Sequence, residues 1–449
     1  MKSRISRSSG CGKGEGSLVR IAFHTLGCKV NQYETQKMVE SFQARGFDVV
    51  DFDERADVYI INSCTVTHTA DSKSRQAARN AWHRNPQALV VLAGCYAETS
   101  PDASAGIEGV SLVLGNRGKD DIADRVLDHL SPEFVATLAP GKSETTRSER
   151  TRATIKIQDG CDQYCSYCAV PFARSTMYSR PRAEVQAELA DLAGRGFREI
   201  VLTGIRLGRY QDEDGASLTD IVRIAAETPG IERVRLSSIE LTDVPEGLID
   251  LMARNRRVCR HLHIPLQSGD AGVLKRMNRP YTPEEFLSFV EQARALVPGL
   301  AVTTDIMVGF PGETVEEFES SRRFFERVRF SRAHVFRYSP RPRTAASRLP
   351  DDVPAAEKGR RSRALIQLAE KHADEFARCI IGEAVPVLVE GKHTEDKLRS
   401  GFTDNYIRVE FEADDHLVGD IVDVEVHSVS RGRARGTITP PDRAARGGT

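Results

Sequence analysis

Between residues 18 and 130 the chain alternates short apolar runs with longer amphipathic segments, a pattern typical of strands alternating with helices. The apolar runs predict four strands, at Val19–Phe23, Val58–Asn62, Ala88–Leu92 and Val110–Leu114. Asn31 followed by Glu34 predicts a capping box that opens a helix running to Arg45, and a second helix is predicted at about Ser72–Arg84. We therefore expect an α/β domain with a small parallel sheet.

The same alternation returns between residues 152 and 378. Six apolar runs predict strands there, at Ala153–Gln158, Glu199–Thr203, Arg233–Ser238, His261–Leu266, Val302–Val308 and Ala333–Tyr338. Helical patterns separate them, at Arg182–Leu192, Glu246–Ala253, Pro283–Leu296 and Val315–Val328. Six such units are too few for a closed eight-stranded barrel, so we expect a partial, open (β/α)6 barrel.

From residue 379 to about residue 440 the pattern becomes one of short alternating strands with turn signals between them. These strands are predicted at Val385–Val389, Tyr406–Phe411, Ile421–Val426 and Ala434–Ile438. They predict a small all-β, OB-like barrel. The remaining segments are interpreted as a disordered tail at 1–17, a linker at 131–151 rich in Pro, Gly, Ser and Thr, and a second tail at 441–449.

Composition narrows the function classes. The 449 residues carry a net charge of −1, so any nucleic-acid contact must come from local basic patches. No run approaches the ~20 apolar residues of a membrane span, and the start of the chain lacks the apolar core of a secretory signal. Nine cysteines are an odd number for a disulfide framework. We expect a cytoplasmic protein, with no membrane partner, whose clustered cysteines bind metal or do chemistry.

Three cysteines lie within eight residues, at Cys161, Cys165 and Cys168. Soft thiolate ligands select iron–sulfur clusters or zinc over hard cations. Three ligands on a [4Fe–4S] cluster would leave one iron open to bind another molecule. The alternative is a zinc knuckle that lacks its fourth ligand, and no fourth Cys or His lies nearby in the sequence.

A second set of cysteines has no local spacing. Cys28, Cys64 and Cys95 each follow one of the first three predicted strands. In a parallel sheet all three would emerge at the carboxyl edge, where ligands of such sheets bind. The alternative is three unrelated buried cysteines, because free cysteine is a common core residue.

The motifs together resemble the methylthiotransferase family of radical S-adenosylmethionine (SAM) enzymes, from about Val19 to Ile438. The matching segments are Thr25–Glu34, Ile61–Thr67, Ala93–Ala97, the Cys161–Cys168 run, Leu236–Glu240, His263–Gly269 and Asp305–Thr314. The resemblance implies an N-terminal domain with an auxiliary [4Fe–4S] cluster on Cys28, Cys64 and Cys95, a radical SAM partial barrel, and a C-terminal TRAM domain that binds RNA.

The resemblance also implies cofactors and their contacts. Two [4Fe–4S] clusters and SAM are expected, with Cys161, Cys165 and Cys168 holding the cluster that cleaves SAM. Tyr167 fits the aromatic position before the last of these cysteines. SAM contacts are expected at the strand ends, from Thr203, Gly204, Ser237, Ser238, Gly309 and Phe310. The alternative for these six is that they are ordinary strand-end residues.

Within the family, the Leu26–Glu34, Cys64–Thr67 and Leu202–Tyr210 segments look most like the branch that acts on threonylcarbamoyl-adenosine in tRNA. The other branches act on isopentenyl-adenosine in tRNA or on an aspartate of a ribosomal protein. The expected partners are a tRNA anticodon stem-loop and an electron donor of the flavodoxin or ferredoxin type, with no DNA. A non-enzymatic alternative is an RNA-binding protein with structural clusters, although such clusters usually have four protein ligands.

Basic residues are the candidates for RNA contact. The C-terminal module ends in Arg431, Arg433, Arg435, Arg443 and Arg446, which suit an RNA backbone or a solvated tail equally. A second group on the barrel is interpreted mainly as solvated helix surface: Arg254, Arg256, Arg257, Arg260, Lys275, Arg276 and Arg279. Cys259 and Cys379 are expected to be structural.

Overall fold

The computed structural model describes residues 19–138, 151–394 and 396–439, which form two compact units. The first unit comprises 19–138 together with two segments from later in the chain, 160–177 and 339–344. The second comprises the rest of the described chain. The two terminal tails, Cys11, Arg443 and Arg446 lie outside the described residues, as does most of the predicted linker. Among the described residues no helix is long and apolar enough to cross a membrane.

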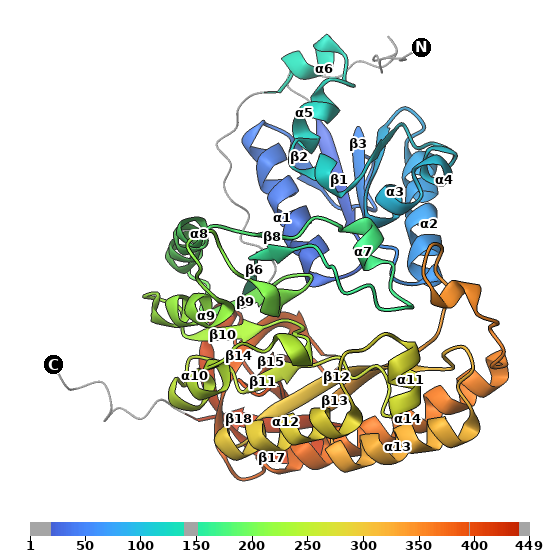
Figure 1. Cartoon of the computed structure of the whole chain (residues 1–449). Coiled ribbons are helices and arrows are strands. Elements are labelled where there is room, and N and C mark those ends of the chain that lie inside the picture. The colour runs from blue at the N-terminus through green and yellow to red at the C-terminus, as the bar shows by residue number, and fades with distance from the viewer. Residues whose placement is uncertain (1–18, 139–150, 395, 440–449) are drawn as a thin grey trace. The chain divides into compact units, whose positions relative to one another are not determined.

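The first unit is built on a five-stranded parallel sheet (Figure 1). Its strands, in the order β2-β1-β3-β4-β5, are Asp48–Val50, Arg20–Thr25, Val58–Ser63, Leu89–Gly94 and Leu112–Leu114. The central strands β3 and β4 are buried along their whole length, as their apolar runs predicted. The edge strand β2 was not predicted, because its three residues are too few for a periodic pattern to show.

Helices cover both faces of this sheet. They are α1 Lys29–Ala44, α2 His68–Arg84, α3 Cys95–Thr99, α4 Pro101–Ala105, α5 Ile122–Leu127 and α6 Pro132–Ala136, and the short helix α7 Val170–Ala173 packs against α3. Phe42 and Val126 pack with Ile60 on one face, while Ala78 and Ala81 pack with Tyr59 on the other. Helix α6 lies inside the stretch interpreted as a linker.

The predicted capping box at Asn31 and Glu34 is wrong. Helix α1 begins at Lys29 with Cys28 in the N-cap position, and no side chain caps it. Asn31 and Glu34 therefore lie inside the helix, where both are buried. Their polar side chains are used in contacts with distant residues instead of with the helix start.

The second unit contains the partial barrel. Its parallel strands are β6 Arg152–Lys156, β9 Glu199–Thr203, β10 Arg233–Leu236, β11 His261–His263, β12 Ala301–Val308 and β13 Arg332–Arg337. They form two three-stranded sheets that are joined by parallel bridges, one of them between Ser238 and His263. This confirms the open barrel of six β/α units.

Helices cover the outer face of these strands. They are α8 Arg182–Gly194, α9 Leu218–Glu227, α10 Leu248–Arg254, α11 Ala271–Arg276, α12 Pro283–Leu296 and α13 Val315–Val328. Three of them begin with genuine capping boxes, at Ser217, Thr282 and Thr314. A short antiparallel pair, β7 Gln158–Asp159 with β8 Tyr178–Ser179, accompanies the barrel.

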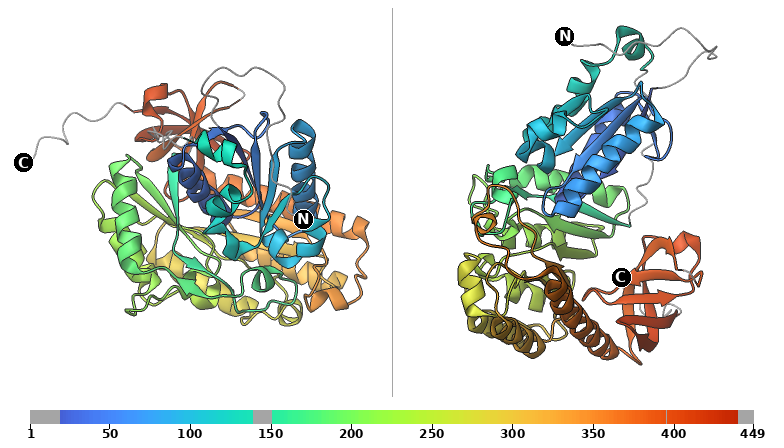
Figure 2. Two further views of the ribbon diagram at one scale, coloured as in Figure 1. Left: turned by 90° about the horizontal axis from the view of Figure 1, so that it is seen from above. Right: turned by 90° about the vertical axis from the view of Figure 1, so that its right-hand side faces the viewer.

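Helix α14 (Ala355–Arg378) leads from the partial barrel to a small closed barrel (Figure 2). The strands of this barrel are β14 Ala384–His393, β15 Arg399–Phe402, β16 Arg408–Phe411, β17 Ile421–Ser430 and β18 Arg433–Ile438. The predicted small β-barrel is confirmed and suits a TRAM domain. Strand β15 was missed, because its sequence contains one apolar residue, Phe402, next to a glycine.

A buried ionic cluster connects the partial barrel to the closed barrel. Arg235 on β10 binds Glu199 on β9 (Nε to Oε1, 2.7 Å) and donates to the carbonyls of Thr403 and Asp404. Arg233 donates to the carbonyls of Pro386 and Phe402. Glu199 is completely buried. Burial alone would raise the pKa of Glu199, but the surrounding arginines outweigh it and hold that pKa below its ordinary value.

We expect Glu199→Ala to lower the free energy of unfolding by about 3–5 kcal/mol, because it leaves buried guanidinium groups without their carboxylate. The matched control is Glu232→Ala, which removes the exposed partner of Arg198 and should cost less than about 1 kcal/mol. Urea denaturation measures both losses. Equal losses in the two variants would mean that the buried cluster does not hold the unit together.

Candidate active site

The structure places Cys28, Cys64 and Cys95 at the carboxyl ends of three neighbouring parallel strands. Cys28 follows β1 and forms the N-cap of α1, Cys64 follows β3 directly, and Cys95 is the first residue of α3 after β4. Strand β3 pairs with β1 on one side and β4 on the other. The three residues thus share one edge of the sheet, as predicted, and this edge is called the cysteine edge below.

Close approaches of the backbone bring the three thiols together. A Cβ placed on Gly27 would lie 2.8 Å from the Cys64 sulfur, and the φ of Gly27 is +99°, which also favours glycine. Burial, with a smaller contribution from the nearby thiols of Cys95 and Cys28, raises the pKa of the Cys64 thiol to about 11. Among the described residues, no disulfide bond joins any of the cysteines.

This donor set fits an iron–sulfur cluster. Within the part of the chain that the structure describes, no three His, Cys, Asp or Glu side chains surround the position of a single metal ion. Cysteines that hold a cluster each bind a different iron atom, so a shared edge is the feature that such a cluster requires. Three thiols on three loops, with glycine where the backbone passes close, meet that requirement.

The loop Cys161–Cys168 belongs to the same compact unit as the cysteine edge. It is closed at its base, because the N–H of Cys161 donates to the carbonyl of Arg174 at 3.0 Å. The N–H of Val170 points at the Cys168 sulfur at 3.4 Å, and helix α7 begins there. Tyr167 is half-buried beside Cys168. Three partly exposed thiols on one tight loop fit the face of a single cluster.

Two side chains that the sequence did not single out lie against the cysteine edge. Asn116, in the 3-10 helix Asn116–Lys119, places its amide nitrogen 3.6 Å from the Cys95 sulfur. Arg341 donates to Thr65, the residue after Cys64, at 2.7 Å and forms a buried ion pair with Asp71. Both residues come from segments with no motif of their own, so only the three-dimensional structure identifies them.

In the second unit, four of the expected SAM contacts lie at adjacent strand ends. Thr203 ends β9, and its hydroxyl donates to Ser237, just past β10, at 3.1 Å. Gly204 follows Thr203, and a Cβ there would lie 3.0 Å from the Gln158 side chain. Ser238 is exposed. Thr203 and Ser237 are buried, so among these four residues Ser238 presents the exposed hydroxyl, and their role with SAM stays a prediction.

Gly309 and Phe310 form a tight corner after β12. Gly309 has a φ of +70°, and its N–H donates to the Glu313 carboxylate at 2.6 Å. Glu313 is itself buried and bound by Arg361 of α14 at 2.7 Å. The Phe310 ring is fully buried and packs edge-on against Tyr338, so the structure presents none of that ring to a ligand. Its expected contact with SAM stays a prediction.

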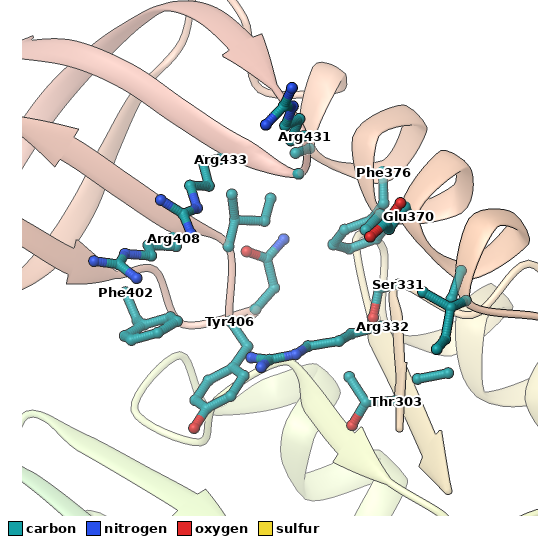
Figure 3. A pocket seen from close by; sticks show the side chains of 18 residues that line it. Thr303, Ser331, Arg332, Glu370, Phe376, Phe402, Tyr406, Arg408, Arg431 and Arg433 are labelled. Atoms are coloured by element: carbon teal, nitrogen blue, oxygen red, sulfur yellow. The ribbon is translucent and has the colours of Figure 1, made fainter. Parts of the chain in front are cut away.

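A pocket of about 390 Å³ lies between the amino ends of β12 and β13, helix α14 and the closed barrel (Figure 3). Arginines from three strands and one turn surround it: Arg332 on β13, Arg408 on β16, Arg433 on β18 and Arg431 in the turn before β18. Arg408 and Arg433 share the carboxylate of Glu410. Among the described residues, no acidic side chain pairs with Arg332 or Arg431, and both are exposed.

Most of the other basic candidates are already paired. Arg435 contacts Asp396 and Glu410. On the partial barrel, Arg260 pairs with Asp404, Arg276 with Glu317 and Arg279 with Glu240. Arg257 donates to the carbonyl of Ala226. The interpretation of the barrel arginines as helix surface therefore fits Arg276, which ends α11, whereas Arg260 lies in the loop before β11 and Arg279 is buried.

Comparisons with known proteins agree with this arrangement. A sequence profile described as "Uncharacterized protein family UPF0004" matches residues 20–115, and that of the radical SAM superfamily matches residues 155–325. The chain is 39% identical to the threonylcarbamoyladenosine tRNA methylthiotransferase MtaB of Bacillus subtilis, over 91% of this chain and 94% of that protein. It is also 39% identical to the protein of the same name in Thermotoga maritima, over 91% and 95%.

More distant matches share the fold. The tRNA-2-methylthio-N(6)-dimethylallyladenosine synthase of Syntrophotalea carbinolica is 33% identical over 90% of this chain and 95% of that protein. Among solved structures, the radical SAM methyltransferase TsrM of Kitasatospora setae, with cobalamin and a [4Fe-4S] cluster bound, superposes with a TM-score of 0.53. That superposition covers 74% of this chain and 77% of TsrM at 15% identity, which shows a common fold.

Proposed function

The chain belongs to the radical SAM tRNA methylthiotransferases, and we propose that it converts threonylcarbamoyl-adenosine, next to the anticodon of a tRNA, to its 2-methylthio derivative. The observation that carries this proposal is the presence of two three-cysteine sets in one compact unit. One set suits SAM cleavage, and the other suits delivery of the sulfur. The choice of substrate rests on the relatives, because the threonylcarbamoyladenosine enzymes are 35–39% identical and the dimethylallyladenosine enzymes 31–33%.

Cys161, Cys165 and Cys168 would hold the first [4Fe–4S] cluster. When bound, that cluster would supply the electron for the cleavage of SAM into methionine and a 5′-deoxyadenosyl radical. With three thiolates from the loop, the chain leaves one position for the amino and carboxylate groups of SAM. Thr203, Gly204, Ser237 and Ser238 would hold the rest of SAM by hydrogen bonds at the strand ends.

Cys28, Cys64 and Cys95 would hold the auxiliary cluster that carries the sulfur. One C–H bond of the adenine base would be replaced by a C–S bond, the hydrogen atom would leave on 5′-deoxyadenosine, and the electron released as the C–S bond forms would return to a cluster. A second SAM supplies the methyl group. The chain must therefore keep the cysteine loop and the cysteine edge at a defined spacing, because both act on one substrate atom.

We propose that the RNA partner is the anticodon stem-loop, held in part by the exposed arginines around the pocket of Figure 3. Arg332 and Arg431 are exposed and lack acidic partners among the described residues, so their charge is available to phosphates. An electron donor of the flavodoxin or ferredoxin type would reduce the clusters. A tRNA substrate suits the cytoplasmic location expected from the cysteine usage.

The double variant Arg332→Ala/Arg431→Ala should weaken tRNA binding and flatten its salt dependence. We expect the slope of log affinity against log salt to become shallower by about 1 per lost phosphate contact, or about 2 in total. The matched control is Arg223→Ala, an exposed arginine of α9 that pairs with Asp220. A salt slope that is unchanged in the double variant would exclude these two arginines as phosphate contacts.

The enzymatic proposal is tested with two tRNAs in anaerobic reconstitution, one bearing threonylcarbamoyl-adenosine and the other isopentenyl-adenosine. The nucleosides from each reaction are separated and identified by mass spectrometry. We expect the methylthio product on the first tRNA only. Methylthio product on the second tRNA alone would mean that the chain acts on isopentenyl-adenosine. Methylthio product on neither tRNA would mean that the proposed substrate class is wrong.

A further inference from the structure

A buried ion pair joins the segment after the cysteine loop to helix α1. The Arg174 guanidinium binds both oxygens of the Glu34 carboxylate, with Nη1 to Oε1 at 2.8 Å and Nη2 to Oε2 at 2.9 Å. The side chains are only 2% and 9% exposed. Two parallel charge-assisted bonds fix direction as well as distance. Burying two charges carries a large desolvation penalty, so such a pair is weak evidence for added stability and stronger evidence for a defined geometry.

Two further groups complete the network around this pair. Lys119 donates to Glu34 at 2.6 Å from a buried position. Asn31 accepts from Arg174 at 2.9 Å, while its amide nitrogen donates to the carbonyls of Leu26 and Ser63. Leu26 lies two residues before Cys28, and Ser63 immediately precedes Cys64. The guanidinium of Arg174 is thus connected to the backbone beside two cysteines of the cysteine edge.

Ala173, the residue before Arg174, is connected to the third cysteine of the edge, Cys95. Asn116 donates to the carbonyl of Ala173 at 2.8 Å with the same nitrogen that faces the Cys95 sulfur. The carbonyl of Arg174 accepts from the N–H of Cys161, the first cysteine of the loop. Ala173 and Arg174, which are consecutive in the chain, therefore contact the start of the cysteine loop and groups that lie beside all three cysteines of the edge.

We propose that Arg174, acting through Glu34, is a positioning residue that sets the spacing between the cysteine loop and the cysteine edge. This inference rests on the proposed function, in which both sets of cysteines serve one substrate atom. A lysine at 174 would keep the charge but lose the two-pronged contact with Glu34. Arg174 is not itself a proposed cluster ligand. A substitution at Arg174 can therefore change the spacing between the two sets of cysteines while each set still binds its cluster.

The test uses the full-length protein with Arg174→Lys and Glu34→Gln. Arg117→Ala is the matched control, since the exposed Arg117 contacts the same segment through Thr176. We expect both variants to keep the wild-type content of iron and labile sulfide and to cleave SAM close to the wild-type rate. The methylthio product formed per SAM cleaved should fall by about 100-fold, the size typical of a 1 Å misplacement. The magnetic interaction between the two reduced clusters, read by electron paramagnetic resonance, should change in both variants and not in Arg117→Ala.

Several outcomes would overturn the proposal. A wild-type product ratio and a wild-type magnetic interaction in both variants would remove the positioning role while leaving the proposed function intact. Loss of iron from both variants would show that Arg174 has a merely structural role. An equal fall in methylthio product per SAM cleaved in Arg117→Ala would show the same. If the wild-type protein itself makes no methylthio product, the proposed function fails, and the magnetic interaction alone decides whether Arg174 sets the spacing.

Discussion

The triple variant Cys28→Ala/Cys64→Ala/Cys95→Ala is expected to form no detectable methylthio product while it still cleaves SAM to 5′-deoxyadenosine. The three residues lie together on one edge of the sheet, and the proposed role of that edge is to supply sulfur. The cysteine loop supplies all three of its own ligands, so it remains complete in this variant. The measurement follows both products over time by liquid chromatography with mass spectrometry.

Cys259→Ala is the control for this experiment. Cys259 is buried in the second unit ahead of β11, and burial raises the pKa of its thiol to about 12. A buried Cys-to-Ala change is expected to cost about 1 kcal/mol of stability, the centre of the range for point mutations, and should leave both activities in place. Methylthio product from the triple variant would contradict a role for the cysteine edge in sulfur transfer.

Cys165→Ala is expected to lose both activities. Without the middle cysteine, the loop offers two thiolates, which is one fewer than the cluster that binds SAM requires. SAM cleavage should fall to the background of a reaction without protein, and product should vanish with it. Reductive cleavage of SAM, with dithionite as the electron source, measures this directly.

Iron analysis provides the control for that loss. The cysteine edge is untouched in Cys165→Ala, so about half of the wild-type iron should remain if each set holds one [4Fe–4S] cluster. SAM cleavage at the wild-type rate in this variant would contradict the assignment of the loop to the radical chemistry. Loss of all iron would instead show that the two sets of cysteines depend on each other.

The sequence predicted the strands that precede the cysteines because each contains a run of apolar residues. Strands β3 and β4 are completely buried, and runs of that kind are readable without knowledge of the fold. Once the strands are placed, the rule that parallel strands end at one edge brings Cys28, Cys64 and Cys95 together. The family indicated by the motifs is confirmed by the comparisons, whereas the ligand roles of the six cysteines stay predictions.

The polar network around Arg174 was not predictable in the same way. Asn31 and Glu34 satisfy the spacing of a capping box, and the local pattern gave no sign that both side chains are used elsewhere. Glu34 lies 85 residues from Lys119 and 140 from Arg174 in sequence. Contacts over such separations depend on the whole fold, and no periodicity of the chain encodes them.

The sequence also suggested domains that follow the order of the chain, with the cysteine loop at the start of the barrel. In the structure, residues 160–177 form a compact unit with the N-terminal sheet, although β6 just before them pairs with the barrel strand β9. Side-chain contacts such as those of Arg174 and Asn116 join residues 160–177 to the N-terminal sheet. The local sequence pattern does not predict such contacts. The proposed domain boundaries stay predictions.

The most direct test of the two-cluster arrangement is the content of iron and acid-labile sulfide per chain after anaerobic reconstitution. It is measured on the wild-type protein and on the Cys28→Ala/Cys64→Ala/Cys95→Ala variant. Two independent three-cysteine clusters predict about eight irons in the wild type and about four in the variant. About four irons in both proteins would mean that the cysteine edge holds no cluster, and sulfur transfer from that edge would be contradicted.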